Sequence, residues 1–90
     1  MVTQYLQELA GEVSAAKYAG LVQLADLPAD EAAEVRDTWP QLGDELRLQI
    51  VARLVEMAEN TVDLDFSAVF HIGLGDATSA VRQKAVVGLW

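Results

Sequence analysis

The sequence predicts an all-α domain, and three observations support this class. Apolar residues recur three and four positions apart through most of the chain, as they do on one face of a helix. No segment alternates apolar and polar residues at the period of two that is typical of a strand. Prolines stand where helical stretches begin or end. We expect six helices, the last three stacked antiparallel, near 3–10, 15–25, 28–39, 44–59, 65–74 and 79–90.

The first half of the chain predicts three short helices. The first of them ends at Gly11, because glycine commonly follows the last helical turn, and the second opens after Ser14. Pro28 fits the first turn of the third helix, since its fixed φ is already helical. Pro40 ends that helix near Trp39, because a residue before proline disfavours the helical conformation.

The second half predicts a long helix followed by two shorter ones. The long helix has a broad apolar stripe whose members lie four apart, at Leu46, Ile50, Leu54 and Ala58. The next helix opens at Asp65, whose carboxylate can accept hydrogen bonds from free backbone amides. Leu64 and Val69 stand where a hydrophobic staple would place them. The last helix runs from about Ser79 to the end of the chain.

The segment GLGDATSAVRQKA, residues 73–85, has two interpretations: a phosphate-binding loop or a corner between two helices. A dinucleotide-binding loop needs a third glycine where Thr78 stands and a strand ahead of it, but the preceding FSAVFHI keeps helical spacing. Asp76 would also repel a phosphate, and no Gly-Lys-Ser/Thr follows as in a P-loop. We therefore interpret the segment as a helical corner, whose glycines end one helix and let two helices pack closely.

The end of the chain, AVFHIGLGDATSAVRQKAVVGLW, resembles a HEAT repeat. The shared pattern is an apolar helix, a turn that opens with aspartate, a Val-Arg pair and an apolar helix end, at Asp76, Val81, Arg82, Ala85 and Leu89. The resemblance implies that Asp76 and Arg82 tie the turn to its adjacent helices by hydrogen bonds. HEAT repeats usually carry prolines around this turn, where this sequence has Ala77 and Ser79. Thr78 is therefore expected to cap the last helix without that stiffening.

Residues 24–70 resemble, less specifically, the segment that precedes the repeats in some bacterial HEAT-repeat proteins. The shared features are a Trp-Pro helix end, a long helix containing RLVEMAE and an LDF opening of the next helix. In such proteins irregular helices close the first end of the solenoid. We expect one domain over 1–90, with irregular capping helices in 1–42 and a long helix plus one HEAT-like hairpin in 43–90.

Charge argues against nucleic-acid and membrane partners. The 90 residues include six Lys or Arg and 14 Asp or Glu, for a net charge of −8, and nine of the acidic residues lie in 1–45. Nucleic acids and anionic membranes both require a basic surface. One acidic helix face is interpreted as solvated, with a basic protein as the alternative partner; it comprises Asp30, Glu31, Glu34 and Asp37. With no signal peptide and no apolar run of 18 residues, a cytoplasmic location is expected.

Residues capable of catalysis form no recognisable constellation, so we expect no enzyme activity, no metal and no cofactor. The chain has no cysteine, which excludes disulfides and thiolate metal sites. His71 is the one histidine, and it lacks the glutamate that follows histidine in metal-dependent proteins of the HEAT class. Asp63 and Asp65 could indicate acid–base or calcium chemistry, but a capping role accounts for Asp65, and a calcium loop needs more oxygen ligands.

The end of the chain predicts an interface. HEAT repeats bury their apolar faces against neighbouring repeats, and this chain stops at VVGLW with no capping glycine or polar tail. Four residues there cannot all face inward on one helix, namely Val86, Val87, Leu89 and Trp90. We expect them to pack against further HEAT repeats of a longer protein or against another copy, which would make the isolated chain a homo-oligomer.

Three functions are therefore considered. The first is a non-catalytic protein-interaction scaffold, the N-terminal capping part of a HEAT-repeat solenoid. The alternative is a self-associating structural module, a homodimer through the apolar C-terminal helix. A HEAT-like enzyme is the third: an alkyl-base DNA glycosylase is disfavoured by the net charge of −8, and nothing marks a pocket for the chromophore of a lyase.

Overall fold

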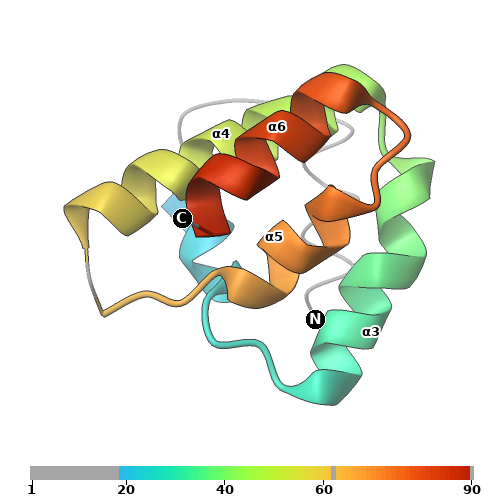
Figure 1. Cartoon of the computed structure of the whole chain (residues 1–90). Helices are drawn as coiled ribbons and strands as arrows, with labels where there is room; N and C mark the ends of the chain where they lie inside the picture. The colour runs from blue at the N-terminus through green and yellow to red at the C-terminus, as the bar shows by residue number, and fades with distance from the viewer. Residues whose placement is uncertain (1–18, 62, 90) are drawn as a thin grey trace.

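Four α-helices, α3 to α6, form most of the domain (Figure 1). A computed structural model describes residues 19–61 and 63–89. No β-strand occurs within these ranges, so the predicted all-α class is confirmed. In chain order the elements are the 3-10 helix η1 (Ala19–Leu24), α3 (Ala29–Thr38), the 3-10 helix η2 (Trp39–Gln41), α4 (Asp44–Asn60), α5 (Ser67–Leu74) and α6 (Ser79–Leu89).

The boundaries predicted for the last four helices agree with the structure to within two residues. The predicted helix 15–25 is described only from residue 19, where a 3-10 helix, η1, takes its place. The predicted helix 3–10 lies outside the described residues, so the count of six helices stays a prediction.

The start of α5 differs from the predicted one. The helix begins at Ser67 rather than at Asp65, because Phe66 already supplies the carbonyl that accepts the first helical hydrogen bonds, from the N–H groups of Val69 and Phe70. Asp65, which immediately precedes the N-cap residue Phe66, still stabilises the start of the helix. Its carboxylate oxygen Oδ1 accepts hydrogen bonds from the backbone N–H of Ser67, at 2.9 Å, and from the Ser67 hydroxyl.

Helix α5 contacts each of the other three described α-helices. Helix α6 packs against both α4 and α5, and α3 contacts α5. In Figure 1, α5 runs in the direction opposite to α6, and the short turn between them forms the predicted corner.

The core lies between these helices and is closed on one side by η1. The apolar stripe predicted on α4 is buried at its centre, where Ile50 and Leu54 are fully buried, and partly buried at its ends. Burial of such side chains contributes about 1.5–3 kcal/mol each to stability. The other fully buried large side chains are Leu21, Leu24, Val35, Val51, Phe66, Val69 and Val81.

Two glycines allow α5 and α6 to approach closely. A Cβ atom added at Gly73 would lie 3.0 Å from the Cβ of Ala85, as expected for a corner glycine that lets helices pack. A Cβ added at Gly88 would lie 2.6 Å from Cζ of Phe70, closer than carbon atoms can come. Gly75 has a different role, because its φ of −95° at the end of α5 is one that any residue can adopt.

We expect Gly88→Ala to lower the free energy of unfolding by about 1–2 kcal/mol, because overpacking against the buried Phe70 ring outweighs the better helix propensity of alanine. Urea unfolding monitored by circular dichroism measures the change. Gly75→Ala is the matched control, since its added Cβ would lie 3.8 Å from the nearest neighbouring atom. Equal stability of Gly88→Ala and wild type would show that α6 does not lie this close to Phe70.

Candidate functional site

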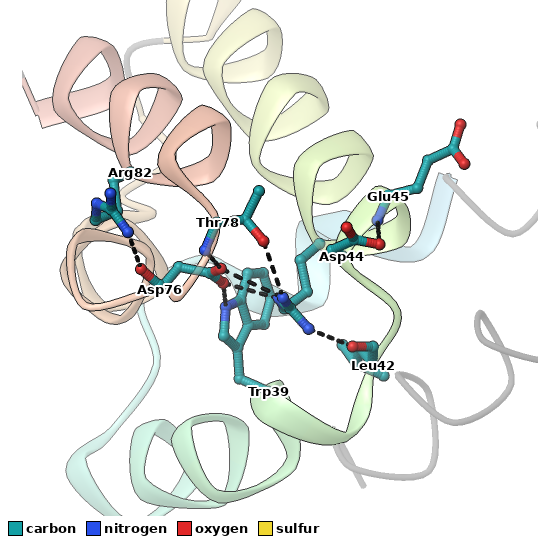
Figure 2. Close-up of polar contacts among 8 residues, drawn as sticks. Trp39, Leu42, Asp44, Glu45, Asp76, Thr78 and Arg82 are labelled. Atoms are coloured by element: carbon teal, nitrogen blue, oxygen red, sulfur yellow. Dashed lines mark hydrogen bonds and ion pairs between the residues drawn. The ribbon is translucent and has the colours of Figure 1, made fainter.

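A buried carboxylate holds the corner between α5 and α6 against the rest of the domain (Figure 2). The side chain of Asp76 is only 1% exposed. Its Oδ2 atom accepts hydrogen bonds from Nε1 of Trp39, at 2.7 Å, and from Nε of Arg47, at 2.8 Å. Its Oδ1 atom accepts the backbone N–H of Thr78 at 2.8 Å. One carboxylate thus joins η2, α4 and the turn before α6.

Arg47 connects the same carboxylate to two further groups. Its Nη2 atom lies 3.4 Å from both Oδ1 of Asp76 and the hydroxyl oxygen of Thr78, and its Nη1 donates to the carbonyl oxygen of Leu42. A buried ion pair is tolerated only when hydrogen bonds satisfy its polar atoms. No buried side-chain nitrogen or oxygen in the described part of the chain lacks such a partner. We call Trp39, Arg47, Asp76 and Thr78 the Asp76 cluster.

Arg82 supports the turn through the backbone. Its Nη1 atom donates to the carbonyl oxygen of Asp76 at 2.7 Å, so the two side chains lie on opposite sides of the turn rather than forming an ion pair. Thr78 stands directly before α6, and its carbonyl oxygen accepts the N–H groups of Val81 and Arg82 at 3.1 and 3.2 Å. Asp76, Thr78 and Arg82, which the HEAT resemblance assigns to the turn, therefore all lie at it. The ion pair of Asp76, however, is made with Arg47.

Sequence reasoning did not identify Trp39 and Arg47 as partners of Asp76. They precede it by 37 and 29 residues, and no local pattern specifies a contact over such a distance. One signal for Arg47 was present, since it stands three residues before Ile50 and seven before Leu54, on the buried stripe of α4. A charged residue on a buried stripe requires a buried partner.

The cluster also determines the protonation of Asp76. Burial raises the pKa of this carboxyl, but hydrogen bonds from Thr78, Trp39 and Arg47, with the positive charge of Arg47, outweigh burial and hold the pKa below its ordinary value of 3.8. Asp76 is therefore a charged hydrogen-bond acceptor at neutral pH. A carboxylate in that state stabilises the fold through its hydrogen bonds and has no proton to donate as a general acid.

The residues predicted to form an interface at the end of α6 separate into two groups. Val86 and Val87 are 46% and 52% exposed, as expected for side chains that cannot face inward. Leu89 is half-buried and packs against the core, and its part in an interface stays a prediction. The physical reason for this packing is spacing, because Leu89 follows the buried Ala85 by four positions and shares its face. Trp90 lies outside the described residues.

The acidic face predicted on the third helix lies on α3. Asp30 and Asp37 are exposed, whereas Glu31 and Glu34 are half-buried. No group of three or more His, Cys, Asp or Glu side chains within 19–61 and 63–89 could hold a metal ion. None of the helices described is long and apolar enough to cross a membrane.

A pocket of about 520 Å³ opens beside the Asp76 cluster, where α3 and η2 meet α5. Arg36 of α3 and His71 of α5, both exposed, line it together with Trp39, Pro40 and Ile72. Arg47 and Asp76 also contribute to its lining. No local sequence pattern links His71 with Arg36, because only the fold brings these two side chains to one pocket.

We expect Asp76→Ala to lower the free energy of unfolding by about 3–5 kcal/mol, because it leaves the buried Arg47 guanidinium without its counter-charge. Asp37→Ala, on the exposed side of α3, is the control and should change stability by less than about 0.5 kcal/mol. If Asp76→Ala does not fold, Trp39→Phe removes one donor and should cost about 1 kcal/mol. Urea unfolding measures all three, and a neutral Asp76→Ala would place the carboxylate in solvent.

The lowered pKa of Asp76 predicts loss of stability in acid. A carboxyl whose pKa is lower in the folded than in the unfolded chain stabilises the fold above the ordinary value of 3.8, and this stabilisation disappears as the pH falls below it. The unfolding free energy should therefore fall less steeply in Asp76→Asn than in wild type as the pH is lowered through this value. Asp65 also has a lowered pKa, through hydrogen bonds from Ser67, so Asp65→Asn is measured alongside. Parallel pH profiles for wild type and Asp76→Asn would contradict the assignment.

The cluster and the pocket belong to a chain that no family model describes. Comparison with protein-family models, with curated proteins and with solved structures found no match. The likeness to HEAT repeats is thus carried by the motif around Asp76 and Arg82, and it contributes to the proposal below.

Proposed function

We propose that this domain is a non-catalytic protein-interaction scaffold, built as the capping part and first helical hairpin of a HEAT-repeat solenoid. The motif at the α5–α6 corner supports this architecture, as does the packing of α6 against α4 and α5. The observation that carries the functional proposal is the outer side of α6, where two adjacent valines are about half exposed. In a solenoid such a surface is covered by the next repeat.

The outer side of α6 also borders a shallow groove. Leu48 of α4 lines it together with Ala80, Gln83, Lys84 and Val87 of α6, and it measures about 340 Å³. The four α6 positions, 80, 83, 84 and 87, are spaced by three, one and three residues, which places them in one stripe along the helix. An apolar side chain from a partner helix would fit between α4 and α6 at this point. We call this groove, with Val86 beside it, the α6 surface.

Self-association through the same surface is the second candidate, and the exposed valines of α6 favour it. The segment Ser79–Leu89 contains Arg82 and Lys84 but no acidic residue, in a chain of net charge −8. Two copies can therefore approach each other through α6 without bringing carboxylates together. A two-fold arrangement would let one apolar patch serve both partners.

A photo-crosslinking residue in place of Val87 tests the proposed surface. We expect one discrete covalent product in cells of the source organism, because a specific partner holds the residue in one environment. A product of twice the chain mass, formed also by the purified chain, identifies self-association, whereas any other single mass identifies a different protein.

Position 22 provides the matched control for this experiment. Val22 is 46% exposed, close to the values for Val86 and Val87, but it belongs to η1 and does not line the groove between α4 and α6. It should give no discrete product. Equal labelling from both positions, or none from position 87, would contradict the proposal that α6 binds a protein.

A further inference from the structure

The pocket beside the Asp76 cluster is separate from the α6 surface and suggests a second binding activity. It is formed by α3, η2, α5 and the turn that follows α5, and its volume of about 520 Å³ lies within the range of sites for small molecules. The α6 surface contributes none of its lining residues. The two binding sites can therefore be tested independently.

The pocket is positively charged, in contrast to the acidic chain as a whole. Among the described residues that line it, Asp76 alone is acidic, and this carboxylate is paired with Arg47. The positive charge of Arg36 is not compensated in this way, because its side chain forms no hydrogen bond or ion pair with another described residue. His71, on the facing helix α5, adds an exposed imidazole. The open polar groups of the pocket thus suit an anion.

The remaining walls suit an apolar group. Pro40 and Ile72 line the pocket, and Trp39 does so with its indole nitrogen already bonded to Asp76. A phosphate would find one uncompensated arginine here, whereas phosphate sites combine several donors. A single carboxylate matches one guanidinium, which binds it through two parallel hydrogen bonds.

We propose that this pocket binds a small organic monocarboxylate. Its carboxylate accepts hydrogen bonds from Arg36 and from the His71 imidazole. Its apolar body lies against Trp39, Pro40 and Ile72. Arg47 and Asp76 position Trp39 at the back of the pocket and do not themselves bind the ligand, because their polar atoms are engaged with each other and with the protein.

Benzoate is the probe that tests this proposal, by titration into the ¹⁵N-labelled chain followed by NMR. We expect saturable shifts of the Trp39 indole N–H and the Gly75 amide, with a dissociation constant on the order of 1 mM for a ligand of this size. Trp90→Phe identifies which indole signal belongs to Trp39. Benzamide, which has the shape without the charge, and inorganic phosphate, which has charge without an apolar body, should give no saturable shift.

Two arginine variants distinguish binding in the pocket from a nonspecific effect of the net charge of the chain. Arg36→Gln should weaken benzoate binding about tenfold or more, because it removes the charged donor. Arg53→Gln removes one positive charge from α4, outside the pocket, and should leave the affinity unchanged. Equal weakening by both variants, saturable binding of phosphate or benzamide, or no saturation by benzoate at about 10 mM would overturn the proposal.

Discussion

The buried carboxylate of Asp76 is the constraint on which the arrangement of the helices depends. Its two oxygens accept hydrogen bonds from an indole, a guanidinium and a backbone amide that belong to three different elements. Hydrogen bonds of this kind require donor and acceptor within narrow limits of distance and angle. The turn before α6, the beginning of α4 and η2 therefore have fixed positions relative to one another.

This constraint also explains where the two proposed binding surfaces lie. Trp39, Arg47 and Asp76 all line the pocket beside the Asp76 cluster, so the group that holds the corner also forms part of the pocket wall. The α6 surface begins just beyond the same turn, at Ala80. The hydrogen bonds of the Asp76 cluster thus help to position both proposed binding surfaces.

The sequence could predict the helices because their signals are local. Pro28 and Pro40 bracket α3, and the apolar spacing of α4 is regular over four turns, so each boundary depends on residues within a few positions of it. Asp76 was also recognisable, since the motif around it is contiguous. Its partners were not, because the pairing with Trp39 and Arg47 arises from the packing of helices distant in the sequence. The pocket is likewise a product of the tertiary fold.

The position of Leu89 against the core follows from helical spacing. Val81, Ala85 and Leu89 are spaced four apart, and the first two are fully buried. The crowding of apolar residues at the end of the chain suggested an interface for all of them, whereas helical spacing assigns one to the core. Periodicity within a helix is thus a better guide to orientation than local apolar density.

The close approach of Gly88 to Phe70 determines more than the distance between α5 and α6. The ring atoms would lie within 2.7 Å of a side chain at this position, so only a residue without one can face the ring. Turning α6 about its own axis by one residue would bring Val87 or Leu89 to that place, and neither fits. The rotational setting of α6 is therefore locked from inside the core. The outward orientation of Val86 and Val87 follows from that setting, so a glycine inside the domain specifies which side chains the proposed α6 surface presents.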